Sequence, residues 1–149
     1  AGANRANGLC MTHKDNWNFT AFHSLDLTAI PKSPGVYLIS DGGEIVYVGM
    51  ARSNLHSRLK SHQNGRRSGN QFAVYVQDFF VLPQCRDQID EIAAGTVRLD
   101  LLVGEYVRSN FEVAWIALES GAEALGMERE LINLHKPVLQ VLARTCPSE

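Results

Sequence analysis

Two short segments rich in valine, isoleucine and tyrosine, residues 36–40 and 44–49, constrain the fold more than any other feature of the sequence. Between them lies Asp41-Gly42-Gly43, a strong signal for a tight turn, so the two segments are expected to pair as a β-hairpin. Ser53 or Asn54 can cap a helix that follows the hairpin directly. The start of the domain is therefore expected to fold as strand, turn, strand and helix.

The remaining elements are predicted from periodicity and from residues that interrupt it. The apolar run at 72–82 fits a strand or a buried helix, and periodicity alone does not separate the two. Asn64-Gly65 is expected to end the first helix, and Pro137 to stop the last one. The other expected elements are helices at 87–94 and 98–108, a strand at 111–118 and a helix at 121–134.

Length and composition indicate a single globular domain preceded by a short lead-in. The chain has 149 residues, of which 45% are hydrophobic and 20% charged, an ordinary balance for a globular protein. We expect a tail and lead-in at 1–29 and one domain at 30–149. No apolar run reaches membrane-spanning length and no secretory signal is visible, so no membrane partner is expected. The three cysteines form no metal-binding or disulfide pattern, which favours a cytoplasmic protein.

Charge is distributed unevenly along the chain. Between Ile45 and Gln77 there is no acidic residue, whereas Asp78 to Glu130 contains eleven acidic residues against four arginines. One end of the molecule can therefore face nucleic-acid phosphates, although a solvated helix face is an equally good interpretation. The basic candidates for nucleic-acid binding are Arg52, Arg58, Lys60, Arg66 and Arg67.

Five polar side chains lie on predicted elements at positions that suit phosphodiester chemistry. Tyr37 and Tyr47 lie on the two hairpin strands, where packing at the edge of a core is the competing explanation. Arg58 and His62, four residues apart, share one helix face, where they can bind a phosphate or form an ordinary surface pair. Glu128 lies in an apolar helix, so its carboxylate either projects into a site or pairs with a base. A carboxylate with water ligands is a typical way to hold Mg²⁺.

The order and spacing of three sequence blocks resemble the GIY-YIG nuclease superfamily. Gly35-Val36-Tyr37 and Tyr47-Val48-Gly49 are similar to the paired motif that names the superfamily, with valine in place of isoleucine. The run from Tyr47 through Arg58 resembles the family's arginine-bearing helix. The block from Glu123 to Gln140 resembles its metal-glutamate helix, particularly that of bacterial excision-repair incision subunits. Residues 63–110 have no counterpart in this pattern and are interpreted as an insertion.

The resemblance implies an α/β (α+β) fold, with a small antiparallel sheet of three strands flanked by helices. It also implies hydrolysis of a phosphodiester by an activated water and one divalent ion, Mg²⁺ or Mn²⁺. On this basis Glu128 is the metal ligand and Arg58 stabilises the transition state. Tyr37 is the general base or positions the water, with His62 as its helper, and Tyr47 orients the phosphate.

Other residues are expected to support the site or to depart from the family pattern. The motif glycines Gly35 and Gly49 are assigned supporting roles. Gln140 stands where the family often has an asparagine that supports the site by hydrogen bonding. Met50 stands where many members have a lysine, so a positive charge near the phosphate is missing.

The resulting functional prediction is a metal-dependent DNA endonuclease, slightly favouring restriction or a related defence role. The alternatives are a nuclease for RNA or for branched or damaged DNA, a non-catalytic nucleic-acid-binding module, and a scaffold for protein contacts. A single active site can only nick, so double-strand cleavage would need a homodimer or two encounters. The insertion at 63–110 is expected to influence the choice of substrate.

Overall fold

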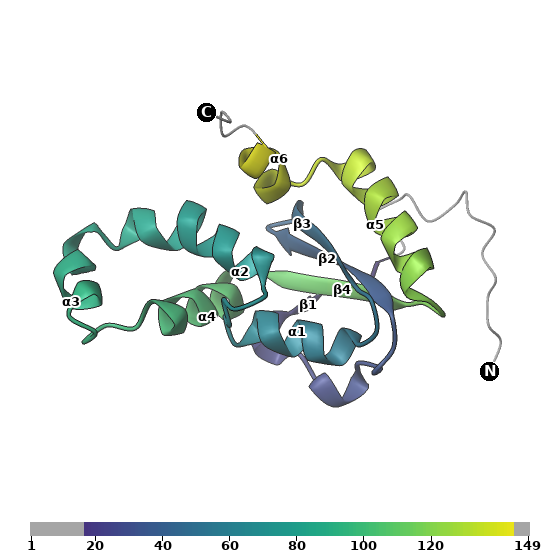
Figure 1. The fold of residues 1–149 in the computed structure, drawn as a ribbon, viewed down its shortest axis with the longest axis horizontal. Coiled ribbons are helices and arrows are strands. Elements are labelled where there is room, and N and C mark those ends of the chain that lie inside the picture. Colours follow the sequence, from purple (N-terminus) through teal and green to yellow (C-terminus); the bar gives the residue numbers. More distant parts are fainter. Residues whose placement is uncertain (1–16, 145–149) are drawn as a thin grey trace.

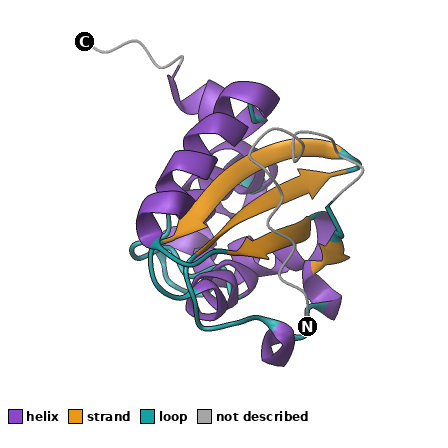
Figure 2. Ribbon diagram, turned by 90° about the vertical axis from the view of Figure 1, so that its right-hand side faces the viewer, coloured by secondary structure: helices purple, strands orange, loops and turns teal. Residues whose placement is uncertain are grey.

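The computed structural model describes residues 17–144, which form one antiparallel sheet with helices on both sides (Figure 1). The strand order is β1-β4-β2-β3. The strands are β1 (Thr20–Ala21), β2 (Gly35–Asp41), β3 (Glu44–Ala51) and β4 (Glu112–Ala117). The longest strands form a continuous twisted layer (Figure 2), and β3 lies at one edge of it.

The predicted hairpin is present and forms the centre of the fold. Strands β2 and β3 pair antiparallel with Tyr37 opposite Gly49 and Ile39 opposite Tyr47, and the register shifts between Ile39 and Ser40. The turn places Gly42 at φ 56° and Gly43 at φ 86°. Two consecutive positive φ angles strongly favour glycine, which explains why the Asp-Gly-Gly signal predicted the turn correctly.

Side chains from successive residues of β2 enter different cores. Tyr37 and Ile39 face a large cluster that includes the helix α1 (Leu55–Gln63). Val36 and Leu38 face a smaller cluster on the opposite side, against α5 (Gly121–His135). Since both faces of the strand are covered, its continuous apolar sequence is explained without alternation of polar residues.

The sheet has four strands, so the predicted count of three is wrong. The fourth strand is β1, which pairs with β4 through Thr20 opposite Val113 and Ala21 opposite Glu112. A strand of only two residues is too short to show a period of two, so periodicity cannot predict it. It lies in the predicted lead-in, part of which packs into the core through Trp17, Phe22 and Leu25. Residues 1–16 of the predicted tail and lead-in lie outside the described residues.

The segment between the first helix and β4 is a helical arm that extends away from the sheet (Figure 1). The apolar run at 72–82 is helical and not extended, in α2 (Gln71–Val76) followed by one π-helical segment (Gln77–Val81). Short turns at Leu82–Gln84 and Arg86–Gln88 lead to α3 (Ile89–Ala93), and α4 (Leu99–Asn110) returns to the sheet. We refer to residues 69–110 as the arm.

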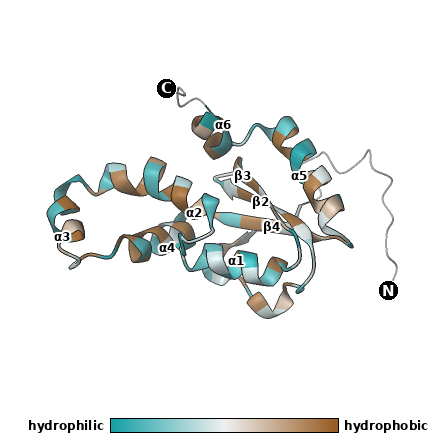
Figure 3. Cartoon of the chain, in the orientation of Figure 1, coloured by the Kyte–Doolittle hydropathy of each residue, from teal (hydrophilic) through white to brown (hydrophobic). Residues whose placement is uncertain are grey.

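Hydropathy and burial distinguish the base of the arm from its tip. Helices α2 and α4 carry apolar segments, whereas α1 is predominantly hydrophilic (Figure 3). The tip of the arm, residues 86–102, contains no buried residue. A final helix not predicted from sequence, α6 (Val138–Arg144), follows Pro137. None of the helices within residues 17–144 combines the length and apolar character needed to cross a bilayer.

Candidate active site

The ring of Tyr37 packs against the neighbouring strand at Gly49, which has no side chain to occupy that space. A β-carbon there would overlap with the ring and the hydroxyl. The hydroxyl is 2.7 Å from Nε2 of His62, and both side chains are almost completely buried. Gly49 therefore leaves the space that the Tyr37 ring needs to place its hydroxyl beside His62.

The register of the hairpin brings Tyr47 to the same side of the sheet as Tyr37. Their ring centroids are 6.4 Å apart, and the Tyr47 ring is also 6.4 Å from the ring of His62. Phe72, from the start of the arm, packs at 5.2 Å from Tyr47 and 4.9 Å from His62. The two tyrosines are thus both packed in the core and grouped at one place, so the two sequence interpretations do not exclude one another.

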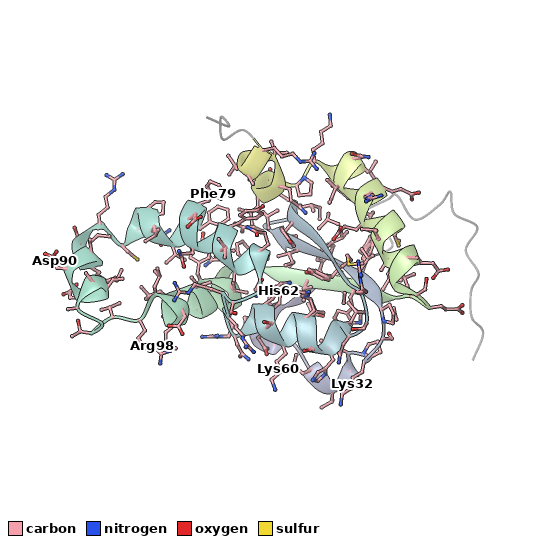
Figure 4. The ribbon with its side chains drawn as sticks, in the orientation of Figure 1. Lys32, Lys60, His62, Phe79, Asp90 and Arg98 are labelled. Carbon is pink, nitrogen blue, oxygen red and sulfur yellow. The ribbon has the colours of Figure 1, made fainter. Side chains whose placement is uncertain are left out.

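Helix α1 presents Arg58 and His62 toward the sheet one turn apart. The helix is capped by Asn54, whose Oδ1 accepts from the Ser57 N–H at 2.9 Å. Arg58 is partly buried and donates from Nη1 to the Gly69 carbonyl at 3.1 Å. Its remaining N–H groups make no hydrogen bond within residues 17–144, so most of the guanidinium is available for a ligand. Figure 4 shows His62 in the middle of the molecule, between α1 and the sheet.

Glu128 approaches the same group of side chains from α5. Its carboxylate is partly buried and forms no hydrogen bond or ion pair with another described residue. It acts electrostatically on Tyr37 and Tyr47, and Arg58 acts on it in turn. The structure therefore brings together all five predicted catalytic residues at β3, from four different elements.

Burial sets the protonation states of this group. It raises the pKa of Tyr37 well above its ordinary value, with a contribution from Tyr47, and only Arg58 opposes the shift. It also raises the pKa of Tyr47, assisted by Glu128. Burial and the positive charge of Arg58 lower the pKa of His62 to about 3, so its imidazole is neutral near pH 7.

The residues present fit a divalent cation held by a single protein carboxylate. Burial raises the pKa of the Glu128 carboxyl, while Arg129 and Arg58 oppose the rise. A cation at this unpaired carboxylate would relieve that desolvation. Residues 17–144 contain no cluster of three or more histidine, cysteine, aspartate or glutamate side chains that could hold a metal. Mg²⁺ suits such a site because it commonly binds through one or two carboxylates and retains several waters.

The predicted supporting residues have identifiable structural tasks. Gly35 lies against Leu55, and a β-carbon there would overlap with that side chain. Gln140 uses both ends of its amide on Val48 of the edge strand: Oε1 accepts from the N–H at 3.0 Å, and Nε2 donates to the carbonyl at 2.5 Å. The amide thereby fixes β3 between the two site residues Tyr47 and Gly49. Met50 packs into the smaller cluster on the α5 side.

The predicted nucleic-acid-binding residues lie at different distances from this group. Arg52 and Arg58 line an open cavity of about 230 Å³ with the hydroxyls of α1, and no acidic residue borders it. Lys60 projects from the outer side of α1 (Figure 4). Arg66 is exposed, and Arg67 donates to Oε1 of Gln77 at 2.9 Å. Arg52 therefore lies next to the candidate catalytic group, and Lys60 does not.

Sequence reasoning missed the contribution of the loop before α2. The Gly69 carbonyl holds Arg58, and Asn70 is buried next to His62. The sequence predicts this loop only as part of the insertion at 63–110, with Arg66 and Arg67 as candidates for nucleic-acid binding. Asn70 precedes an apolar run and so carries the signal of a helix N-cap, which the structure shows, but its proximity to His62 depends on how the arm folds back.

Comparison with known proteins supports the resemblance found in the sequence. The sequence model of the GIY-YIG catalytic domain matches residues 33–140. Among curated proteins, UvrABC system protein C of Anaeromyxobacter dehalogenans is 36% identical over 119 residues, 79% of this chain. The protein of the same name from Solibacter usitatus is 28% identical over 116 residues, 77% of this chain. The chain spans only 13% and 14% of the length of these two relatives.

Solved structures of the same kind of domain are also similar. The magnesium-bound GIY-YIG N-terminal endonuclease domain of UvrC from Thermotoga maritima is 22% identical, with a TM-score of 0.41. It covers 76% of this chain and 89% of its own. The family match covers most of the chain and includes all five residues of the candidate site. The chain is therefore a member of the GIY-YIG catalytic domain family, the class of endonuclease that its sequence motifs predict.

Proposed function

We propose that this chain is a divalent-metal-dependent endonuclease that hydrolyses phosphodiester bonds of DNA. The observation that supports this most strongly is that His62 is hydrogen-bonded to Tyr37 while Arg58 and Glu128 act electrostatically on the same tyrosine. The phenol of Tyr37 can serve as a general acid–base group. The guanidinium of Arg58, with most of its N–H groups unpaired, can bind a phosphate, and the unpaired carboxylate of Glu128 can bind a cation. A module that only binds nucleic acid has no need of a partly buried, unpaired carboxylate.

Each side chain has a task that its position allows. Arg58 binds the scissile phosphate through the N–H groups that Gly69 leaves free, and stabilises the charge that develops on its oxygens. Tyr37 positions the attacking water and accepts its proton, and Tyr47 orients the phosphate. Glu128 would hold one divalent cation, Mg²⁺ or Mn²⁺, which supplies positive charge next to the reacting phosphate. Since burial raises the pKa of Tyr37, its hydroxyl stays protonated near neutral pH, and it accepts the proton of water only as its own proton passes to Nε2 of His62.

The substrate proposal is DNA, and incision at damaged or branched sites is the second candidate. The relatives named UvrABC system protein C favour the second candidate over restriction or defence, which none of them supports. Because the chain corresponds to a small part of those proteins, recognition of damage and association with other subunits do not transfer to it. A homodimer is proposed only for double-strand cleavage.

Incubation of the purified chain with supercoiled plasmid in Mg²⁺, Mn²⁺ or EDTA tests the proposal. We expect metal-dependent conversion to nicked circles, with linear product only if two subunits act together. Sedimentation measured at the same protein concentration distinguishes those two cases. Absence of cleavage of plasmid, single-stranded DNA and RNA in every metal would reject the enzymatic function and leave a binding module.

A further inference from the structure

The imidazole of His62 is buried and neutral, so only one of its two nitrogens carries a proton. Tyr37 is 2% exposed, and the only hydrogen bond of its hydroxyl within residues 17–144 is to Nε2 of His62. A buried O–H without an acceptor costs about 1–3 kcal/mol. The Tyr37 hydroxyl therefore donates to Nε2, and the ring proton of His62 is on Nδ1.

A proton on Nδ1 also needs a hydrogen-bond acceptor, because Nδ1 is buried as well. It has no hydrogen bond of regular geometry with any other described residue. The loop before α2 passes close to it: Gly69 contacts Arg58 one turn earlier in α1, and the Phe72 ring lies 4.9 Å from the His62 ring. Asn70 lies between these two contacts in sequence and is itself 2% exposed.

The Oδ1 oxygen of Asn70 can accept a second hydrogen bond. Oδ1 accepts from the Ala73 N–H at 3.1 Å, which occupies one of its two lone pairs. Nδ2 has no partner within residues 17–144, so a small rotation of the amide breaks no other hydrogen bond. Asn70 lies close enough to His62 to raise the pKa of its imidazole against the effects of burial and Arg58. A small rotation that brings Oδ1 toward Nδ1 would supply the acceptor that the Nδ1 proton needs.

We propose that Asn70 is a positioning residue of the active site: its Oδ1 accepts from Nδ1–H of His62 and so keeps Nε2 as the acceptor for the Tyr37 hydroxyl. The lone pairs of the Tyr37 oxygen are then directed toward the site, where the oxygen can take a proton from water as its own proton passes to Nε2 of His62. The role of Asn70 in cleavage rests on the proposed function, whereas the tautomer of His62 does not. The arm therefore contributes to the candidate site through Asn70, the N-cap residue of α2.

The test uses the full chain with ¹⁵N-labelled histidine near pH 7. Long-range ¹H–¹⁵N correlation spectra distinguish the two neutral tautomers, and the His62→Gln variant identifies the His62 signals by their loss. We expect the wild-type protein to show Nδ1–H. Asn70→Ser keeps a good helix cap but is too short to reach His62, and should shift the ring toward Nε2–H. Asn70→Asp keeps an oxygen that can accept from both the Ala73 N–H and Nδ1 of His62, and should retain Nδ1–H.

Plasmid cleavage gives the second measurement. Asn70→Ser should lower kcat roughly 10- to 100-fold, as is usual for loss of an orienting hydrogen bond to a functional histidine, with KM for plasmid unchanged. Asn54→Ser, the same change at the cap of α1, serves as the control for the spectrum and should leave the His62 tautomer unaltered.

The outcomes separate the two proposals. A wild-type spectrum with Nε2–H, or an Asn70→Ser spectrum identical to wild type, would overturn the role of Asn70 whether or not DNA is cut. The expected tautomers without any cleavage by the wild-type protein would support the positioning role and reject the nuclease proposal. If Asn70→Ser fails to fold, the wild-type and Asn70→Asp spectra still decide.

Discussion

The sheet with its two flanking helices and the arm are built on different principles. In the sheet, two positions have no space for a β-carbon, and Tyr37 fills the space above one of them. The arm consists of helices of several types, and its tip, residues 86–102, contains no buried residue. Close backbone contacts fix the geometry of the sheet, whereas the tip of the arm has no buried side chains to fix it.

This difference locates the part of the arm that matters for chemistry. Gly69, Asn70 and Phe72, at its entry, contact Arg58, His62 and Tyr47, while the tip contacts none of them. Substitutions in the catalytic group, in the glycine positions and at the tip should therefore differ strongly in their effects.

Glu128→Gln should have the largest effect on cleavage. The amide keeps the size of the side chain but removes the charge that would bind the cation, a loss worth several kcal/mol and on the order of 10³-fold in rate. Plasmid cleavage and Mn²⁺ binding followed by calorimetry measure it. Glu130→Gln, on the exposed side of the same helix, is the control and should act as wild type. Equal Mn²⁺ affinity in both variants would contradict the assignment.

Arg58→Ala should lower the rate on the order of 10²–10³-fold, the usual cost of one transition-state donor. Arg58→Lys keeps the positive charge, but a lysine cannot bind the Gly69 carbonyl and also form a bidentate hydrogen bond with a phosphate, as a planar guanidinium can. It should recover only part of the rate. Full activity of the lysine variant would show that charge alone, without the geometry set by the loop, is sufficient.

The sequence predicted the hairpin region better than the arm for a physical reason. The Asp41-Gly42-Gly43 turn and the close approaches at Gly35 and Gly49 leave local signatures that one sequence can show. The side of the sheet on which Tyr47 lies depends on a register shift, and the position of Asn70 depends on long-range packing. Neither has a local signature. The short β1 strand was missed because pairing with β4, and not its own propensity, stabilises it.

Gly49→Ala should break the sheet geometry without removing a functional group. The added methyl overlaps with the Tyr37 ring, so we expect a loss of about 1–3 kcal/mol of stability and displacement of the hydroxyl from His62. Gly126→Ala is the matched control: a β-carbon there meets nothing, and alanine in a helix gains about 0.5–1 kcal/mol. Urea unfolding of the two variants should give changes of opposite sign.

His62 should make the stability of the protein depend on pH. Its pKa is lowered to about 3 in the folded chain, against about 6.5 when unfolded. Between these values the unfolded state binds one proton more, so the free energy of unfolding rises with pH and falls on acidification. Relative to His62→Gln, wild type should lose about 1.4 kcal/mol for each pH unit below about 6.5. Urea titrations at about pH 7 and about pH 5 measure this; parallel behaviour of the two proteins would mean that His62 is not buried and neutral.

Leu101→Ser should have the smallest effect, although it removes a large apolar side chain from the arm. Leu101 is 60% exposed, and substitutions at such positions usually change stability by no more than about 0.5 kcal/mol. Val103→Ala, two residues along α4 at a fully buried position, should cost about 2 kcal/mol through lost burial and the cavity left behind. Both variants should cleave plasmid as wild type does once folded, because neither residue contacts the catalytic group. A large loss of DNA affinity in Leu101→Ser, with stability unchanged, would instead show that the tip of the arm contacts the substrate, and the contrast between a functional base and an inert tip would have to be abandoned.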